Sequence, residues 1–434
     1  MKENKTSNLK LAKLASYSGL SRLFKAISGP VILLIIGKKL SLEEISFYFT
    51  FFNLIAMQQL AELGIGHVIK LSIAHSFSHT EDKINFKIKS YFYFSILWFL
   101  AISIFIILFV GYGGNLFYSS YNGNVDWFYP WWCLVISSSL VSLLTPISLL
   151  LEGAQQQLIL YKSQVISSII NPIMICISLY LDFGLYSISL GLIISNIFLY
   201  LILLPSFLKF LKKIKSCNVK VRLIEVFKEL WPLLSKVSIV WGLGFIFWNG
   251  FNLIAFKTLS PIDAGKLIFT FTLAKAGFSI AESFTQSHMT YYSAQISQRK
   301  VNITYKSFLK YRKIALTILV LGYSFFLTLS HIMPDFYIFN KISNIYISLQ
   351  IFLFFIFLLI LTTNNNFIRC FKVEPFAVVS AYHSLICPLA FFFSCLFLPN
   401  AYFILPSVII LGSIYWSKKI SYGYILQCRN DHDQ

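Results

Sequence analysis

The chain has 434 residues, of which 57% are hydrophobic and only 12% are charged, with a mean hydropathy of +0.72. Soluble domains carry about 25% charged residues, so this composition excludes a soluble globular protein and indicates a polytopic membrane protein. The formal net charge of +19 could suit a nucleic-acid partner. We expect none, because the positions of the basic residues relative to the apolar stretches explain the charge better.

Apolar stretches run almost the full length of the chain. A helix that crosses the hydrocarbon layer needs about 20 mainly apolar residues. Twelve segments meet this criterion: 14–37, 44–74, 91–111, 127–151, 162–181, 185–207, 233–256, 263–291, 314–333, 344–368, 376–397 and 401–417. The sequence therefore predicts an all-α, polytopic membrane protein with about twelve transmembrane helices.

The distribution of Lys and Arg predicts the orientation of these helices. Only five of the 36 basic residues fall in one set of loops, namely Lys38, Lys39, Lys257, Lys266 and Lys341, whereas most of the others lie in the opposite set and at the two termini. Cytoplasmic loops carry the excess of Lys and Arg. Both termini should therefore be cytoplasmic, and the protein should lie in the cytoplasmic (inner) membrane of a bacterium.

Two features divide the chain into halves. Residues 208–232 form the longest basic loop and follow the sixth apolar segment, so we predict lobes of six helices at 1–207 and 233–434, joined by a basic cytoplasmic linker at 208–232. In addition, residues 40–64 resemble residues 259–284. Internal repeats of this kind place a substrate site between the halves, near the middle of the membrane.

Four cations and two carboxylates stand inside the apolar segments. Charge at this depth costs roughly 2.5–3.5 kcal/mol on insertion scales, so it persists where it faces water, a partner or a ligand. The set is mostly positive, which favours an anionic ligand. The cations proposed to bind substrate are Arg22, Lys25, Lys70 and Lys275, and the carboxylates proposed to couple an ion gradient are Glu62 and Glu282.

Other polar residues follow the same helical faces as the charges. We expect them to line an aqueous cavity: Ser18, Gln58, Asn249, Asn252, Ser279 and Gln286. A competing interpretation is that Glu62 and Glu282 neutralise cations on neighbouring helices and serve assembly alone. The amides at 364–366 could likewise bind sugar hydroxyls or join helices by hydrogen bonds.

Several short motifs, in order, resemble one family. They are Glu62-Leu63-Gly64-Ile65-Gly66 in the second segment, Leu151-Glu152-Gly153-Ala154-Gln155 at the end of the fourth, and Asp182-Phe183-Gly184-Leu185 between the fifth and sixth. Together with a basic first helix and a basic central loop, they resemble the polysaccharide-repeat (O-antigen, Wzx-type) flippases. These flippases form a branch of the multidrug/oligosaccharidyl-lipid/polysaccharide exporter superfamily.

The resemblance implies a function in polysaccharide biosynthesis. It implies a MATE-like fold of two pseudo-symmetric six-helix lobes around a V-shaped cationic cavity. It also implies transport of an undecaprenyl-pyrophosphate-linked oligosaccharide, such as an O-antigen unit for lipopolysaccharide, between membrane leaflets. A polysaccharide polymerase and a chain-length regulator would be partners, beside the membrane lipids. The charges that bind substrate in that family do not occupy fixed positions, so the candidate residues above rest on their helical spacing.

Enzymatic functions find little support in the sequence. There is no Gly-rich phosphate loop and no arrangement of a nucleophile with His and Asp, so we expect a transporter without catalytic residues, metal or cofactor, driven by a proton or cation gradient. Two alternatives stay open. One is a drug/cation antiporter on the same fold, for which an acidic cavity would be expected. The other is a membrane glycan polymerase or glycosyltransferase, which the short outer loops disfavour.

Overall fold

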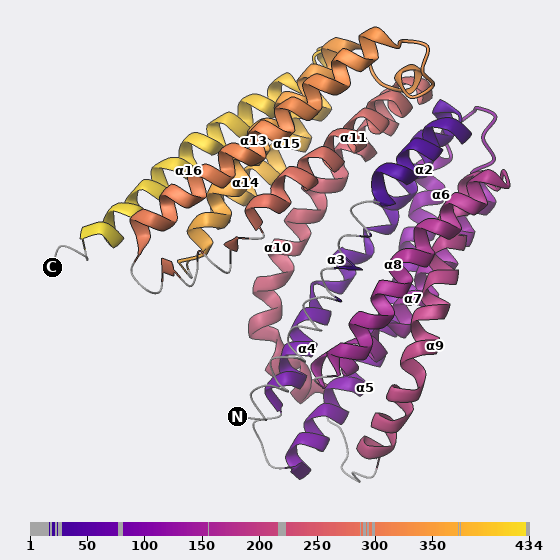
Figure 1. The fold of residues 1–434 in the computed structure, drawn as a ribbon. Coiled ribbons are helices and arrows are strands. Elements are labelled where there is room, and N and C mark those ends of the chain that lie inside the picture. Colours follow the sequence, from indigo (N-terminus) through magenta and orange to yellow (C-terminus); the bar gives the residue numbers. More distant parts are fainter. Residues whose placement is uncertain are drawn as a thin grey trace. The chain divides into compact units, whose positions relative to one another are not determined.

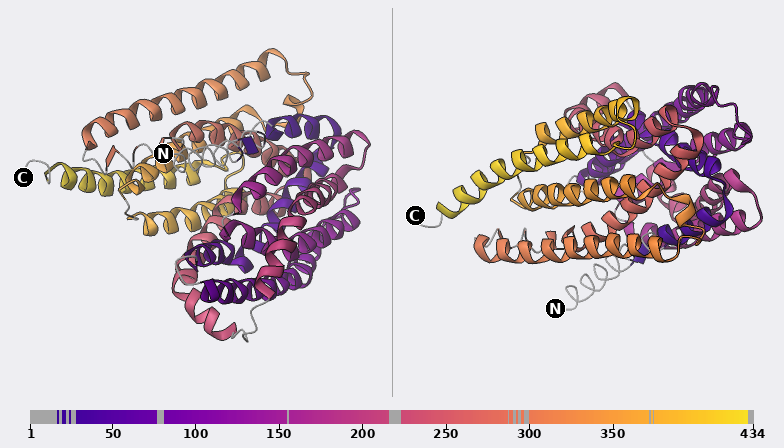
Figure 2. Two further views of the ribbon diagram at one scale, coloured as in Figure 1. Left: turned by 60° about the horizontal axis from the view of Figure 1, so that its bottom comes forward. Right: turned by 90° about the horizontal axis from the view of Figure 1, so that it is seen from above.

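The computed structural model describes residues 17, 20, 21, 24, 28–76, 81–154, 156–215, 223–286, 288, 289, 292, 295, 296, 300–371, 373 and 375–430. Every regular element in this part of the chain is a helix (Figures 1 and 2), which confirms the all-α prediction. The helices group into two compact units. Unit 1 comprises Met1–Leu40 and Thr50–Phe245, and unit 2 comprises Ser41–Phe49 and Ile246–Gln434.

Unit 1 is a helical bundle in which α7 packs against α4, α5 and α9, while α8 packs along α9. Residues 28–39 are also helical. These helices and the other elements as far as residue 258 have the following bounds: α2 (Leu42–Ile55), α3 (Gln58–Glu62), α4 (Ile65–Ser76), α5 (Glu81–Phe105), the π-helix η1 (Ile106–Gly111), α6 (Tyr112–Tyr118), α7 (Phe128–Gly153), α8 (Gln157–Tyr180), the 3₁₀ helix η2 (Gly184–Tyr186), α9 (Ser187–Lys215) and α10 (Leu223–Thr258). Helices α2 and α10 contribute residues to both units.

Unit 2 is a second bundle, in which α14 packs against α11, α13 and α16, and α15 packs against α16. A group of Phe rings forms its centre, with Phe251 of α10 contacting Phe271, Phe354, Phe391 and Phe403. These helices and the 3₁₀ helix between two of them have the following bounds: α11 (Pro261–Gln286), α13 (Val301–Ile332), η3 (Phe339–Lys341), α14 (Ile345–Arg369), α15 (Ala377–Phe397) and α16 (Ile404–Asn430).

Eight helical segments in the described part of the chain are long and apolar enough to cross a membrane. They confirm a polytopic membrane protein and coincide with eight of the twelve predicted segments. Two of the others, 233–256 and 401–417, lie largely within α10 and α16. Segment 14–37 lies partly outside the described residues, and segment 44–74 is divided into α2, α3 and α4.

The division of segment 44–74 has a local cause. The helix tightens after Ile55 and ends a second time at Leu63 and Gly64, both with positive φ (52° and 72°). Gly adopts this left-handed conformation freely, but Leu does so at a cost of about 1–2 kcal/mol. The short helix α3, which carries Gln58 and Glu62, is thereby separated from its neighbours at both ends.

The proposed internal repeat has a structural counterpart at the start of two helices. Ser41 and Glu44 form a capping box before α2, with Ser41 N–H donating to Glu44 Oε2 (2.8 Å) and Glu44 N–H to Ser41 Oγ (3.2 Å). Ser260 and Asp263 occupy the same places at α11, where Asp263 N–H donates to Ser260 Oγ (3.2 Å). At the start of both helices, the N–H of an acidic residue therefore donates to the hydroxyl of a serine three residues earlier.

The predicted linker at 208–232 is largely helical where it is described. Helix α9 continues to Lys215, and α10 begins at Leu223. The start of α10 packs on α5 through Phe227, whose ring stacks on that of Trp98 at 6.3 Å, and through a 3.3 Å ion pair between Lys87 and Glu229. The two contact units divide within α10, between Phe245 and Ile246.

Candidate functional site

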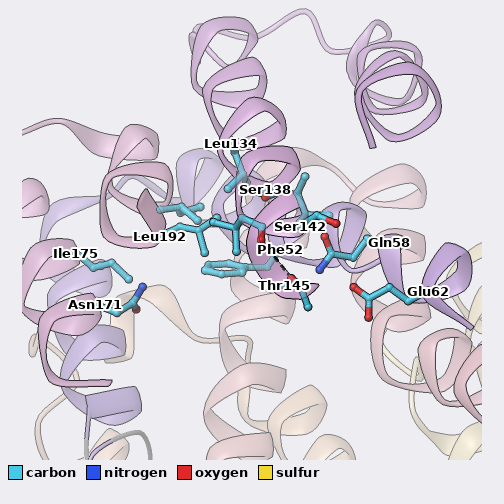
Figure 3. A pocket seen from close by; sticks show the side chains of 13 residues that line it. Phe52, Gln58, Glu62, Leu134, Ser138, Ser142, Thr145, Asn171, Ile175 and Leu192 are labelled. Atoms are coloured by element: carbon cyan, nitrogen blue, oxygen red, sulfur yellow. Dashed lines mark hydrogen bonds between the residues drawn. The ribbon is translucent and has the colours of Figure 1, made fainter. Parts of the chain in front are cut away.

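A cavity of about 210 Å³ lies inside unit 1 (Figure 3). Helices α2, α3, α7, α8 and α9 enclose it. The residues that line it are Phe52, Ile55, Gln58, Glu62, Leu134, Ser138, Val141, Ser142, Thr145, Asn171, Ile175, Ile188 and Leu192. Glu62 is the one charged residue among these thirteen, so the lining of this cavity is acidic and otherwise neutral.

Short helix α3 brings Gln58 and Glu62 to the cavity. Four residues apart, they lie on the same side of the helix, and Figure 3 shows both side chains on the same side of the cavity. The breaks at either end of α3 interrupt the regular hydrogen bonding of the helix. Discontinuous helices of this type supply polar backbone groups to ion and substrate sites in membrane transporters.

Helix α7 forms a polar wall opposite α3 from Ser138, Ser142 and Thr145, which follow i, i+4 and i+7 spacing. The Thr145 hydroxyl donates to Val141 O at 3.2 Å. Further along the helix stands Pro146, which has no N–H to donate to the carbonyl of Ser142. This wall therefore offers the cavity the hydroxyl groups of Ser138, Ser142 and Thr145.

Three polar atoms at this cavity are buried without a hydrogen-bond partner in the described part of the chain. They are Gln58 Oε1, Ser138 Oγ and Ser142 Oγ, and the two serines are only 5% and 4% exposed. Leaving such a group unsatisfied costs about 1–3 kcal/mol. Together with the Glu62 carboxylate, they form a set of oxygen atoms that could bind a small polar ligand, a proton or a hard cation.

The sequence did not single out Asn171, Ser138, Ser142 or Thr145. Asn171 of α8 lies across the cavity from Glu62 in Figure 3 and donates from Nδ2 to Ser195 Oγ at 3.3 Å. An Asn-Pro pair in an apolar segment and a serine stripe on α7 were the available signals. Neither identifies a cavity until the helices are placed side by side.

In unit 2, Lys275, Ser279, Glu282 and Gln286 follow i, i+4, i+7 and i+11 spacing on α11 and so share one face of that helix. The Lys275 ammonium lies over the Trp248 ring of α10, 4.8 Å from its centroid. Glu282 is hydrogen-bonded to Gln286 and to Thr362 of α14. Among the described residues, neither Lys275 nor Glu282 forms an ion pair.

The other predicted residues have different surroundings. Lys70 of α4 pairs with Glu152 at the end of α7, with 3.2 Å between Nζ and Oε1. Asn252 of α10 is buried, and its Oδ1 has no described partner. Its neighbour Asn249 lies one turn earlier on the same helix and is half-buried. Ser18, Arg22 and Lys25 lie outside the described residues.

The amides of α14 join helices. Asn364 Nδ2 donates to Ser417 Oγ and to Ser421 Oγ of α16, both at 2.8 Å, and the Ser417 hydroxyl donates to Asn365 Oδ1. Of the two interpretations of this Asn run, the structure supports interhelical hydrogen bonding for these two residues.

Comparison with known proteins shows the fold. No family model and no curated protein matches the chain. A multidrug-resistance MATE family transporter of the MOP superfamily, solved in an inward-facing conformation, covers 95% of this chain and 99% of its own length, with a TM-score of 0.72 at 13% identity. The lipid II flippase MurJ in an inward closed conformation covers 95% of this chain and 87% of its own length, with a TM-score of 0.61 at 16% identity.

A third similar structure is a MOP superfamily transporter from Pyrococcus furiosus, described by the reverse polarity of its binding pocket. It covers 96% of both chains, with a TM-score of 0.53 at 13% identity. The chain thus has the fold of this group of membrane transporters, and the MATE-like fold expected from the sequence is confirmed.

Proposed function

We propose that this protein is a transporter that moves a lipid-linked, anionic oligosaccharide across the bacterial cytoplasmic membrane. The observation that carries the proposal is Lys275, a cation in the middle of a membrane-spanning helix whose described surroundings provide an aromatic ring and no carboxylate partner. A cation at such depth is costly unless an anion or water meets it. The fold, shared with a lipid II flippase, supports this function.

The pyrophosphate of an undecaprenyl-linked oligosaccharide suits Lys275. Its oxygens accept charge-assisted hydrogen bonds from an ammonium. On the same face of α11, Ser279 provides a neutral polar group one turn from the charge, and Gln286 provides another about three turns from it. The lipid tail would stay in the bilayer while the polar head passes the protein by alternating access. In the predicted topology, transport runs from the cytoplasmic to the outer leaflet, as O-antigen and related polysaccharide biosynthesis requires.

The cavity in unit 1 supports ion coupling through Glu62. Its carboxylate shares the cavity with Gln58 and with the unpartnered hydroxyls of Ser138 and Ser142. Protonation, or binding of a monovalent cation, would satisfy these oxygen atoms in one state of the cycle. Glu282 is the second candidate, although Gln286 and Thr362 already hydrogen-bond its carboxylate.

Replacing Lys275 tests the substrate site. Lys275→Ala should lower the rate of flipping by about tenfold or more, because a hydrogen bond to a charged group contributes about 1.5–3 kcal/mol. Lys275→Arg should retain much of the activity. The measurement is flipping of a fluorescent undecaprenyl-pyrophosphate oligosaccharide in reconstituted vesicles, with exposed Lys38→Ala as the matched control. Flipping at the wild-type rate by Lys275→Ala would refute the site.

A drug/cation antiporter is the second candidate function. The observation that favours it is the acidic cavity, in which Glu62 is the one charged lining residue, and the likeness to multidrug MATE transporters. This function predicts that vesicles export a cationic dye when a proton or Na⁺ gradient is imposed, and that Glu62→Gln abolishes the export. Dye export that depends on Glu62, without any flipping of lipid-linked oligosaccharide, would select the antiporter.

A further inference from the structure

A second polar cavity, of about 180 Å³, lies within unit 2 at the end where α11 and α14 begin. It is distinct from the polar face around Lys275, which starts more than two helical turns beyond Leu267 on α11. Two apolar residues, Leu267 and Ile347, contribute to its lining. The six polar residues that complete the lining are Asp263, Lys266, Ser343, Asn344, Asn400 and Tyr402.

Hydrogen bonds hold the walls of this cavity in place. Ser343 N–H donates to Thr270 Oγ1 of α11 at 2.9 Å, which fixes the start of α14 against that helix. The segment that contains Asn400 and Tyr402 forms the third wall. Gln350 of α14 holds this segment, because its Nε2 donates to Asn400 O at 2.6 Å and its Oε1 accepts from Phe403 N–H at 3.1 Å. The cavity is therefore preorganised by the backbone and by residues outside its lining.

Several side-chain groups are left for a ligand. The Asn344 side chain caps α14 by accepting from Ile347 N–H through Oδ1 (2.9 Å), which leaves its amide Nδ2 to donate. Asn400 is held with a positive φ of 65°, and its side chain has no partner among the described residues. The Tyr402 hydroxyl is hydrogen-bonded to the backbone of Asn400, and its ring forms part of the lining.

The charges of the cavity select the class of ligand. It contains one carboxylate, Asp263, which accepts from the Ser260 hydroxyl at 2.7 Å, and one ammonium, Lys266, and neither belongs to a described ion pair. A free phosphate would face Asp263, and a simple cation would face Lys266. A neutral ligand with many hydroxyl groups can donate to the carboxylate and accept from the ammonium and the amides at the same time.

We propose that this cavity binds one sugar residue of a glycan. Pockets for drug-sized ligands measure about 300–1,000 Å³, so a cavity of about 180 Å³ takes a single ring. The charge pattern of the chain predicts that this end of unit 2 faces outward. The source of the sugar rests on the proposed function, since the oligosaccharide released on the outer side is the glycan that meets the cavity.

Saturation-transfer NMR on the purified full chain tests the proposal, in a detergent that has no sugar head group. The probes are glucose, galactose, N-acetylglucosamine and N-acetylgalactosamine, with glycerophosphoethanolamine as a zwitterionic head-group probe. We expect transfer to at least one sugar. Lys266→Met and Asn400→Gly should each weaken its binding by about tenfold or more. Gly retains the backbone conformation at position 400, so this variant removes the amide alone.

Lys38→Met serves as the control, since Lys38 is exposed and lies outside the cavity. The proposal is overturned if no sugar shows transfer, if only glycerophosphoethanolamine does, or if both cavity variants bind sugar as the wild type does. Flipping of lipid-linked oligosaccharide by the wild-type chain in vesicles is a separate measurement. Sugar binding that depends on Lys266, in a chain that flips no lipid-linked oligosaccharide, would refute the proposed function and leave the sugar site standing.

Discussion

A charged side chain inside a membrane helix needs something to compensate for its burial. The described charges meet this need in different ways. Lys70 has the Glu152 carboxylate, Lys275 has the Trp248 ring, and Glu282 has the hydrogen bonds of Gln286 and Thr362.

Glu62 differs from these residues because it faces a cavity with unsatisfied oxygen atoms. It does not pair with Lys70, so the interpretation that the two predicted carboxylates neutralise the predicted cations is not supported among the described residues. This distinction makes Glu62 the first candidate for coupling and Lys275 the first candidate for binding an anion.

Glu62→Gln tests whether the Glu62 carboxylate couples flipping to an ion gradient. The amide has nearly the shape of the carboxylate but cannot carry or release a proton at this position. We expect the variant to fold and to bind lipid-linked substrate while its flipping no longer responds to an imposed pH or Na⁺ gradient. The measurement is the flipping rate in vesicles with and without the gradient.

Glu225→Gln, on the exposed start of α10, is the matched control and should respond as the wild type does. Glu282→Gln should be measured in parallel, since Glu282 is the second candidate. If both Glu62→Gln and Glu282→Gln keep the full gradient response, the carboxylates do not couple transport.

The division of the second apolar segment is the main event at the level of elements. Leu63 and Gly64 both have positive φ, so the helix ends directly after Glu62 and does not continue into α4. We expect Leu63→Gly to change stability by less than about 1 kcal/mol. The strain of a left-handed Leu is removed, but the packing of a half-buried side chain is lost and the unfolded chain gains entropy.

Gly64→Ala should instead lower stability by about 1–2 kcal/mol, because Ala is strained at this φ. Gly66→Ala is the control, since its added Cβ would meet Leu149 at an ordinary 3.4 Å. Thermal unfolding of the purified variants in detergent gives the comparison. A greater loss for Leu63→Gly than for Gly64→Ala would show that the break does not have this backbone conformation.

The start of α11 packs tightly on the start of α2 within unit 2. A Cβ placed on Gly265 would lie 2.0 Å from the Leu42 carbonyl oxygen, which is backbone and cannot move as a side chain does. Gly265→Ala should therefore destabilise the protein by about 1–3 kcal/mol.

Gly412→Ala is the matched control, because its Cβ would meet nothing within 4 Å and α16 gains a better helix former. We expect the lowest melting temperature for Gly265→Ala, an intermediate one for the wild type and the highest for Gly412→Ala. Equal temperatures for Gly265→Ala and wild type would contradict the close approach of the two helices.

The topology is the prediction that belongs to the whole molecule. The excess of Lys and Arg on one side predicts cytoplasmic termini and an odd number of crossings before residue 120. A reporter fused after residue 120 should be active outside, and one fused after residue 225 should be active inside. Readings on the opposite sides would reverse the orientation and would move the proposed sugar site to the cytoplasmic face.

Much of the fold follows from local features of the sequence. Apolar runs of spanning length predicted most helices of both units, because the hydropathy of a segment depends on that segment alone. One local signal misled. The predicted segment 91–111 ends where a Gly-rich stretch begins, yet α6 continues the helix to Tyr118. There, Gly111 O accepts from Trp131 Nε1 at 2.9 Å, and Gly114 lies directly against that ring.

By itself, the sequence determined an all-helical membrane protein with charges at membrane depth, because hydropathy and charge are properties of each segment alone. Only the tertiary structure decided which group compensates each charge. Glu152 is distant from Lys70 in sequence, and the walls of the Glu62 cavity come from five helices. Partners of this kind depend on which helix faces pack together, and a helical period fixes the face of a residue without naming the helix that it meets.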